Sequence, residues 1–213
     1  MKKYGKLTAG IIVAWFIAAV IASAMHVFTN GSGRVGVAVG VAASAPILLF
    51  GAWYLTSSAF RDFTHSLNPR TLTILQSWRV LGLMFVVLQT YKILPAVFAL
   101  PAGYGDMVIG ATAVLVGTRL ANPATRTQFM AWQWLGIADL LTAVGLGTTA
   151  AVIDPNGIPM APLTMLPLSL IPTFLVPLFF VFHLICLAQA KQWKTTTSTR
   201  GPELGVPRPA FAK

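Results

Sequence analysis

Several ionisable or amide side chains lie inside otherwise apolar segments of this chain, and they are its candidates for chemistry. They are Arg79, Gln89, Lys92, Asp106, Asp139 and His183, with the hydroxyls of Ser169 and Thr173 in the last apolar segment. Two carboxylates could share one proton as acid and base, so Asp106 and Asp139 are the catalytic candidates. The cations could neutralise these carboxylates, and a histidine can carry a proton near neutral pH. Together these residues predict a network that binds a small solute or moves protons.

Other site chemistries fit the sequence less well. The two aspartates and His183 are dispersed along the chain and lack the local spacing of a zinc site. His26, His65 and His183 are expected at three different depths, which does not suit a haem held by two histidines. Cys186 is the only cysteine, so an intrachain disulfide and a CxxC motif are excluded. We therefore expect no metal and no cofactor.

The composition predicts a membrane around this network. Hydrophobic residues make up 56% of the 213 residues and charged residues only 9%, and the mean hydropathy is +0.74. Soluble domains carry about 25% charged residues, and a chain of this length cannot bury so much apolar surface in water. The sequence therefore predicts an integral membrane protein with lipids as its partners. The net charge of +10 then reflects membrane topology, and no nucleic-acid partner is expected.

Apolar runs long enough to cross a bilayer recur along the chain. They fall at about residues 8–28, 35–57, 74–100, 104–120, 129–153 and 163–190. About 20 apolar residues span a hydrocarbon core of about 30 Å. The predicted fold class is therefore all-α, a polytopic bundle of six transmembrane helices. We expect residues 1–190 to form a single bundle and residues 191–213 a basic, disordered cytoplasmic tail.

Lysines and arginines gather in alternate connections. They precede the first run and follow the second, fourth and sixth runs. In the connections on the opposite side the only charged residues are Arg34 and the acidic Asp154. The positive-inside rule then places both termini in the cytoplasm. The start MKKYGK with Ala22-Ser23-Ala24 also resembles a cleavable secretory signal. The first run is long enough to span, so a retained helix is the favoured interpretation.

Helical spacing predicts that the polar side chains face the interior of the bundle. Asp106 shares a face with Gly110 and Gly117, and Asp139 shares one with Gly136. Small residues on one face let helix backbones approach closely in a membrane. An ionised group in mid-bilayer costs at least about 2.5 kcal/mol, so it usually faces the protein interior and finds a partner there.

The third and sixth runs also carry their polar residues on one side. On the third run these are Arg79 and Gln89, aligned with Gly82 and Val86. On the sixth they are Ser169, Thr173 and His183, provided that Pro167, Pro172 and Pro177 do not rotate the helix too far. Prolines at this spacing must kink the helix.

The expected depths of these residues predict two sets of pairs. Lys92 and Asp106 flank an external turn and are expected to pair near the outer end. Arg79 is expected to pair with Asp139 or His183 further in. The alternative is a set of buried pairs that only fixes helix packing.

The segment 94–106 allows two backbone conformations. Pro95 and Pro101 interrupt helical hydrogen bonding, and Gly103 and Gly105 permit tight turns. One interpretation is a broken or re-entrant segment that lines a cavity, as transporters use in their binding sites. The other is a tight external turn before the fourth helix.

Gly103-Tyr104-Gly105-Asp106 resembles the GxGD motif of intramembrane aspartyl proteases, which include the presenilin and prepilin peptidase families. The resemblance implies two aspartates that share a proton, with Asp139 as the partner. In those families the partner aspartate precedes the GxGD helix, whereas Asp139 follows it.

A wider resemblance covers roughly residues 75–190. It is carried by Trp78-Arg79 with Gly82, Leu94-Pro95, Pro101-Ala102-Gly103 with Gly105-Asp106, Trp132 with Gly136 and Asp139, and Leu168 through Pro172 with Val176-Pro177 and His183. The set resembles a family of small, functionally uncharacterised bacterial membrane proteins, which implies the bacterial inner membrane and no activity. In size and topology the chain is also similar to the six-helix substrate-binding subunits of energy-coupling vitamin transporters.

Three functions follow as hypotheses. The first is binding or movement of a small solute or of protons through the buried charged network. The second is an intramembrane hydrolase that uses Asp106 and Asp139, as GxGD-like aspartates or with a metal. The third is an accessory or structural subunit of a larger membrane complex, with partner membrane subunits.

Overall fold

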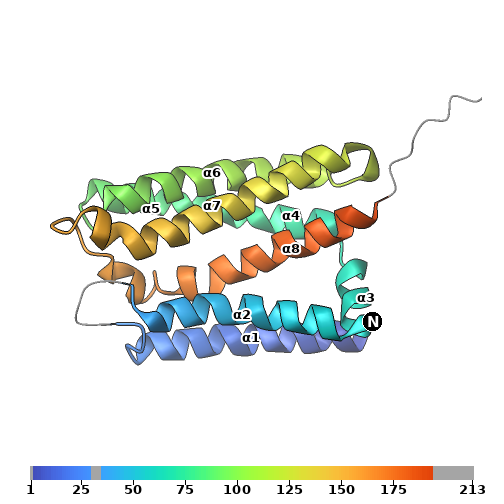
Figure 1. The fold of residues 1–213 in the computed structure, drawn as a ribbon, viewed down its shortest axis with the longest axis horizontal. Helices are drawn as coiled ribbons and strands as arrows, with labels where there is room; N and C mark the ends of the chain where they lie inside the picture. Colours follow the sequence, from blue (N-terminus) through green and yellow to red (C-terminus); the bar gives the residue numbers. More distant parts are fainter. Residues whose placement is uncertain (1, 30–34, 194–213) are drawn as a thin grey trace, which may run out of the picture.

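The structure is a computed structural model that describes residues 2–29 and 35–193 (Figure 1). Its α-helices are α1 (Lys2–Ala24), α2 (Val37–Thr56), α3 (Ser58–Ser66), α4 (Pro69–Leu75), α5 (Leu83–Thr90), α6 (Ala96–Arg119), α7 (Arg126–Ile153) and α8 (Val176–Gln192). The 3₁₀ segments η1 (Gln76–Gly82), η2 (Pro123–Thr125) and η3 (Ala161–Thr164) and the π-helical η4 (Ile171–Leu175) complete the described elements. The described chain contains no strand, which confirms the all-α fold class. Arg34 and most of the basic tail, residues 194–213, lie outside the described residues.

Six segments of the described chain are long and apolar enough to span a membrane, so the chain is a multi-pass membrane protein. They are Tyr4–Ala24, Val37–Thr56, Pro69–Thr90, Ala96–Arg119, Pro123–Ile153 and Ile171–Gln192. The third span joins α4, η1 and α5 into one rod, and α3 is a short helix between the second and third spans. In Figure 1, α6 and α7 lie along one edge of the bundle and α1 and α2 along the other, with α8 between them.

The third to sixth spans form the packed centre of the bundle. The helix α6 packs along the whole third span and against α7, and α8 packs against α7, α4 and α2. Glycines make the contact between α6 and the third span close: Gly110 lies against the backbone of Val80, and Gly117 against Ile74. The small-residue face predicted for the fourth span is therefore the face that contacts the third.

The connection between the third and fourth spans lies earlier in the chain than the apolar runs predict. The chain turns at residues 91–95, and α6 begins at Ala96 and continues through Pro101. The broken or re-entrant segment considered for residues 94–106 is therefore wrong. Pro101 removes one backbone hydrogen bond from α6, yet the helix continues to Arg119. Asp106 is then ten residues beyond Ala96, about 15 Å into the helix instead of at its start.

Helix starts at the end of the bundle that carries α3 follow standard capping chemistry. The Ser57 side chain accepts a hydrogen bond from the Phe60 N–H at the start of α3. The Asn68 side chain accepts one from the Arg70 N–H, with Pro69 in the first turn of α4. Asparagine and serine satisfy free N–H groups there, and proline has none to lose. These caps place the start of the third span, and with it Arg79.

Candidate functional site

Arg79 is the centre of a buried polar network. Its side chain is 1% exposed. The Nε atom donates to Asp106 Oδ1 at 2.7 Å, and Nη2 donates to Asp139 Oδ2. The Nη1 atom donates to the Gly136 carbonyl at 3.3 Å and lies 3.2 Å from His183 Nε2. One guanidinium thus joins the third, fourth, fifth and sixth spans.

These contacts define the tautomer of His183. A guanidinium has only donors, so His183 Nε2 accepts from Arg79 and the imidazole is neutral. The proton on Nδ1 is then donated to Gln133 Oε1 at 2.5 Å. Gln133 Nε2 donates in turn to Thr73 Oγ1 at 3.2 Å, and that hydroxyl donates to the Pro69 carbonyl at 2.8 Å. The hydrogen bonds form a directed chain from the network towards the start of α4.

The two carboxylates share one cation. Asp106 and Asp139 contact neighbouring N–H groups of Arg79, and their side chains are 16% and 12% exposed. Because His183 is neutral, one guanidinium and two ionised carboxylates leave one formal negative charge. A buried charge without a partner is strongly unfavourable in a membrane. A bound proton or a small cation at the carboxylate pair would balance it.

Three glycines leave the space that the side chains of this network occupy. A Cβ atom added to Gly82 would overlap the Asp106 side chain, and one added to Gly105 would overlap the Asp139 carboxylate. A Cβ atom on Gly136 would overlap the His183 imidazole. The helices at the site therefore approach more closely than residues with side chains would allow.

Two apolar clusters enclose the network along the bundle. The cluster towards the α3 end contains Leu72, Ile109, Ala113, Val116, Ala121, Phe129, Trp132, Ile185, Cys186 and Ala190. The cluster towards the opposite end contains Phe85, Leu94, Phe98, Ala99, Ala102, Ala150, Met160 and Leu163. On α6, Asp106 falls between Ala102 of one cluster and Ile109 of the other. The ion pairs of Arg79 thus lie between two apolar layers, one formed by each cluster, and the hydrogen bonds through Gln133 and Thr73 continue on the α3 side.

The structure brings Arg79, Asp139 and His183 together, as their expected depths indicate. The expected pair of Lys92 with Asp106 is wrong. Lys92 is exposed in the turn after α5, where its φ of 56° is left-handed, and Asp106 pairs with Arg79 instead. The reason is the early start of α6, which moves Asp106 away from the turn. Gln89 is half-buried, and within the described chain no hydrogen bond joins its side chain to the network.

Ser169 and Thr173 also lie outside the network, contrary to expectation. The Ser169 hydroxyl donates to Ser23 Oγ of α1 at 2.8 Å, and the Thr173 hydroxyl donates to the Ser169 carbonyl at 2.7 Å. A π-helical turn at Ile171–Leu175 precedes α8 and changes the helical phase between Thr173 and His183. Residues that a regular helix would align therefore face different neighbours.

Sequence reasoning missed Gln133 and Thr73, which link the network to the α4 end. Both side chains are fully buried. Gln133 is an amide within an apolar span, one turn before Gly136. This position could have indicated that its side chain belongs to the network. Thr73 resembles the many threonines that bond to their own helix, so its type and spacing did not distinguish it.

Gln133→Leu should destabilise the protein by about 1–3 kcal/mol, because it leaves the His183 Nδ1–H without an acceptor in a buried site. Thermal unfolding of the detergent-purified protein measures this change. Gln192→Leu is the matched control, since the Gln192 side chain is exposed at the end of α8. Equal unfolding temperatures for the two variants would contradict the role assigned to Gln133.

The arrangement sets two carboxylates and an imidazole around one guanidinium. Among the described residues, no group of three or more His, Cys, Asp or Glu side chains is placed to hold a metal ion. The carboxylates are bound to a guanidinium, and the nearby imidazole is oriented by Arg79 and Gln133. Such a site can hold or release a proton or a small cation. Its role in binding or catalysis stays a prediction.

Comparison with known proteins gives one family. A family model with the description Domain of unknown function (DUF8737) matches residues 35–190, which include α2 to α7, α8 as far as Ala190, and every residue of the network. The helix α1 precedes the matched range. Neither curated proteins nor solved structures give a match. The resemblance to an uncharacterised family is confirmed, over a longer range than residues 75–190.

Proposed function

The chain belongs to the family described as Domain of unknown function (DUF8737), and we propose that it binds and moves protons or another small cation across the membrane. The observation that carries the proposal is the charge balance at Arg79, where one buried guanidinium contacts the carboxylates of both Asp106 and Asp139. We further propose that the membrane is the bacterial cytoplasmic membrane, with both termini on its inner side.

A cation fits this site better than an anion does. The guanidinium already has a carboxylate on each of two N–H groups, and its third nitrogen contacts a carbonyl and an imidazole. Four of the five N–H groups of Arg79 thus already have acceptors within the described chain, which leaves little of its charge for an added anion. The partial exposure of both carboxylates leaves room for one more ligand on the negative side of the cluster. A proton needs the least space.

The backbone around the site supports movement as well as binding. Arg79 lies in the 3₁₀ segment η1, and the π-helical η4 precedes the helix that carries His183. Such departures from α-helix often mark hinges or functional sites within helices. The apolar layers on either side would close the site to both membrane faces, so transport requires that they open in turn.

The hydrolase hypothesis has weaker support. Aspartyl proteases need two carboxylates that share a proton and reach a water molecule. Here each carboxylate accepts a hydrogen bond from Arg79 instead. The accessory-subunit hypothesis predicts that the purified protein alone moves no ion, so the same experiment separates it from transport.

Proteoliposomes with an internal pH indicator test the proposal. We expect the wild-type protein to dissipate an imposed proton gradient, and Asp106→Asn and Asp139→Asn to reduce the rate to that of protein-free vesicles. Asp62→Asn is the control, because Asp62 is exposed on α3. Parallel vesicles with Na⁺ or K⁺ gradients identify another cation. Wild-type protein that moves none of these ions would overturn the proposal.

Stability measured on the same variants separates function from packing. If the pairs serve only packing, each Asp→Asn change loses an ion pair and lowers the unfolding temperature. If the cluster carries one excess negative charge, removal of one carboxylate leaves a balanced pair and the unfolding temperature stays level or rises.

A further inference from the structure

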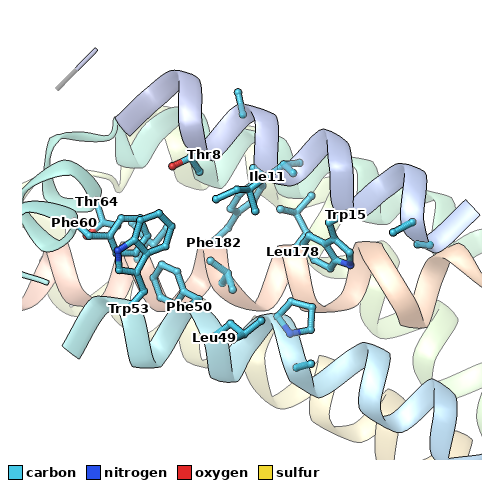
Figure 2. A pocket seen from close by; sticks show the side chains of 18 of the residues that line it. Thr8, Ile11, Trp15, Leu49, Phe50, Trp53, Phe60, Thr64, Leu178 and Phe182 are labelled. Atoms are coloured by element: carbon cyan, nitrogen blue, oxygen red, sulfur yellow. The ribbon is translucent and has the colours of Figure 1, made fainter. Parts of the chain in front are cut away.

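A large cavity lies on the opposite side of α8 from the network. It has a volume of about 1040 Å³ and is lined mainly by α1, α2, α3 and α8 (Figure 2). Ligand pockets for small molecules usually measure about 300–1,000 Å³, so this cavity is at the upper end of that range. On α8, Leu178 and Phe182 line the cavity, whereas His183 faces the network. The cavity is therefore separate from the charged site.

Aromatic side chains line the cavity at the α3 end and near the opposite end. At the α3 end, Trp53 stacks on Phe60 with ring centroids 3.9 Å apart, and Phe63 also lines the wall. Near the other end, Phe28 is 5% exposed. Between the ends, Ile11 and Leu49 line the cavity while 46% and 70% exposed. The cavity thus opens sideways towards the bilayer, and its occupant enters from the lipid.

The lining requires a hydrocarbon occupant. The lining hydroxyls belong to Thr8, Thr64 and Thr173. Thr64 and Thr173 donate to backbone carbonyls of their own segments, and the Trp15 indole N–H donates to the Thr173 carbonyl. Of these hydroxyls, only that of Thr8 has no hydrogen-bond partner among the described residues. The Trp53 indole N–H also makes no hydrogen bond among the described residues, so an occupant meets at most two unpaired polar side-chain groups along the cavity.

The length of the cavity and the cationic side chains near its α3 end fit a phospholipid. The lining runs on α1 from Gly5 to Ala22, about 26 Å along the helix, which exceeds one leaflet of a hydrocarbon core about 30 Å thick. Lys6, exposed on α1, follows the lining residue Gly5, and Arg61 follows the lining residue Phe60 on α3. Arg61 Nη1 donates to the Tyr54 and Leu55 carbonyls at the end of α2, so its charge is held at this end of the cavity. Cationic side chains at this depth attract anionic headgroups. We propose that the cavity binds the acyl chains of an anionic phospholipid whose headgroup lies beside Lys6 and Arg61.

Photo-crosslinking tests the unaltered protein first. The full chain is reconstituted in phosphatidylglycerol vesicles that contain a small fraction of phosphatidylglycerol with a diazirine in one acyl chain. We expect labelled peptides to include the inward-facing lining residues Ile12, Trp15 and Phe182. Labels confined to outward residues such as Leu48, which is 69% exposed and is not in the lining, would overturn the proposal.

A pair of variants then tests the site by native mass spectrometry. Ala42→Phe with Ala45→Phe fills the cavity from α2 and should abolish retention of phosphatidylglycerol in mild detergent. Ala52→Phe, on the exposed face of α2, should retain it. Lys6→Gln should lower the retention of phosphatidylglycerol towards that of phosphatidylcholine. Retention by the filled variant, an isoprenoid as the bound molecule, or a second protein copy in place of lipid would each overturn the proposal.

Discussion

Arg79→Gln should be among the most damaging single substitutions in this protein, with a loss of about 3–5 kcal/mol of folding free energy. Glutamine removes the positive charge but leaves Asp106 and Asp139 facing each other at the centre of the bundle. Their mutual repulsion then acts where water cannot screen it. Thermal unfolding in detergent, followed by size-exclusion chromatography, measures the loss.

Three further variants make this prediction specific. Arg70→Gln is the matched control, because Arg70 is exposed at the start of α4. Arg79→Lys should rescue little, since an ammonium cannot reproduce the planar fork that reaches two carboxylates. The triple variant Arg79→Gln, Asp106→Asn, Asp139→Asn should recover most of the lost stability, because no buried charge is left unpaired. A triple variant no more stable than Arg79→Gln would show that packing, not charge, dominates at this position.

Gly110→Ala should cost about 1–3 kcal/mol through overpacking, although alanine is the better helix former. The added Cβ would overlap the backbone nitrogen of Val80 and would lie 2.9 Å from the carbonyl carbon of Arg79. Backbone atoms cannot rotate away as side-chain ends do, so η1 must shift from α6. This shift would also displace Arg79 from Asp106, and we expect the variant to lose transport as well as stability.

Gly145→Ala is the control for Gly110→Ala. No heavy atom lies within 4 Å of the Cβ that alanine would add there, so helix propensity should decide the outcome. A glycine inside a helix costs up to about 1 kcal/mol relative to alanine, so this variant should be at least as stable as the wild type. Similar losses for both variants would show that the contact between α6 and η1 is not the cause.

Several features of this protein were determined by the sequence alone. Composition and six long apolar runs were enough for a multi-pass all-α bundle, because only hydrogen-bonded helices of about this length satisfy their backbone in lipid. The glycine faces on the third to fifth spans predicted which sides of the helices pack together. Buried charges must find partners in a membrane, so a central cluster with Arg79, Asp139 and His183 was predictable.

Tertiary structure decided which partners met. The connection between the third and fourth spans lies at residues 91–95, earlier than the apolar runs predict. Asp106 is therefore about 15 Å inside α6, where it pairs with Arg79 instead of Lys92. Proline and glycine permit several backbone conformations, and only packing between helices selects one of them. The π-helical turn before α8 likewise separated Ser169 and Thr173 from His183. Local spacing cannot predict such changes of phase, because one inserted residue rotates every side chain before it relative to those after it.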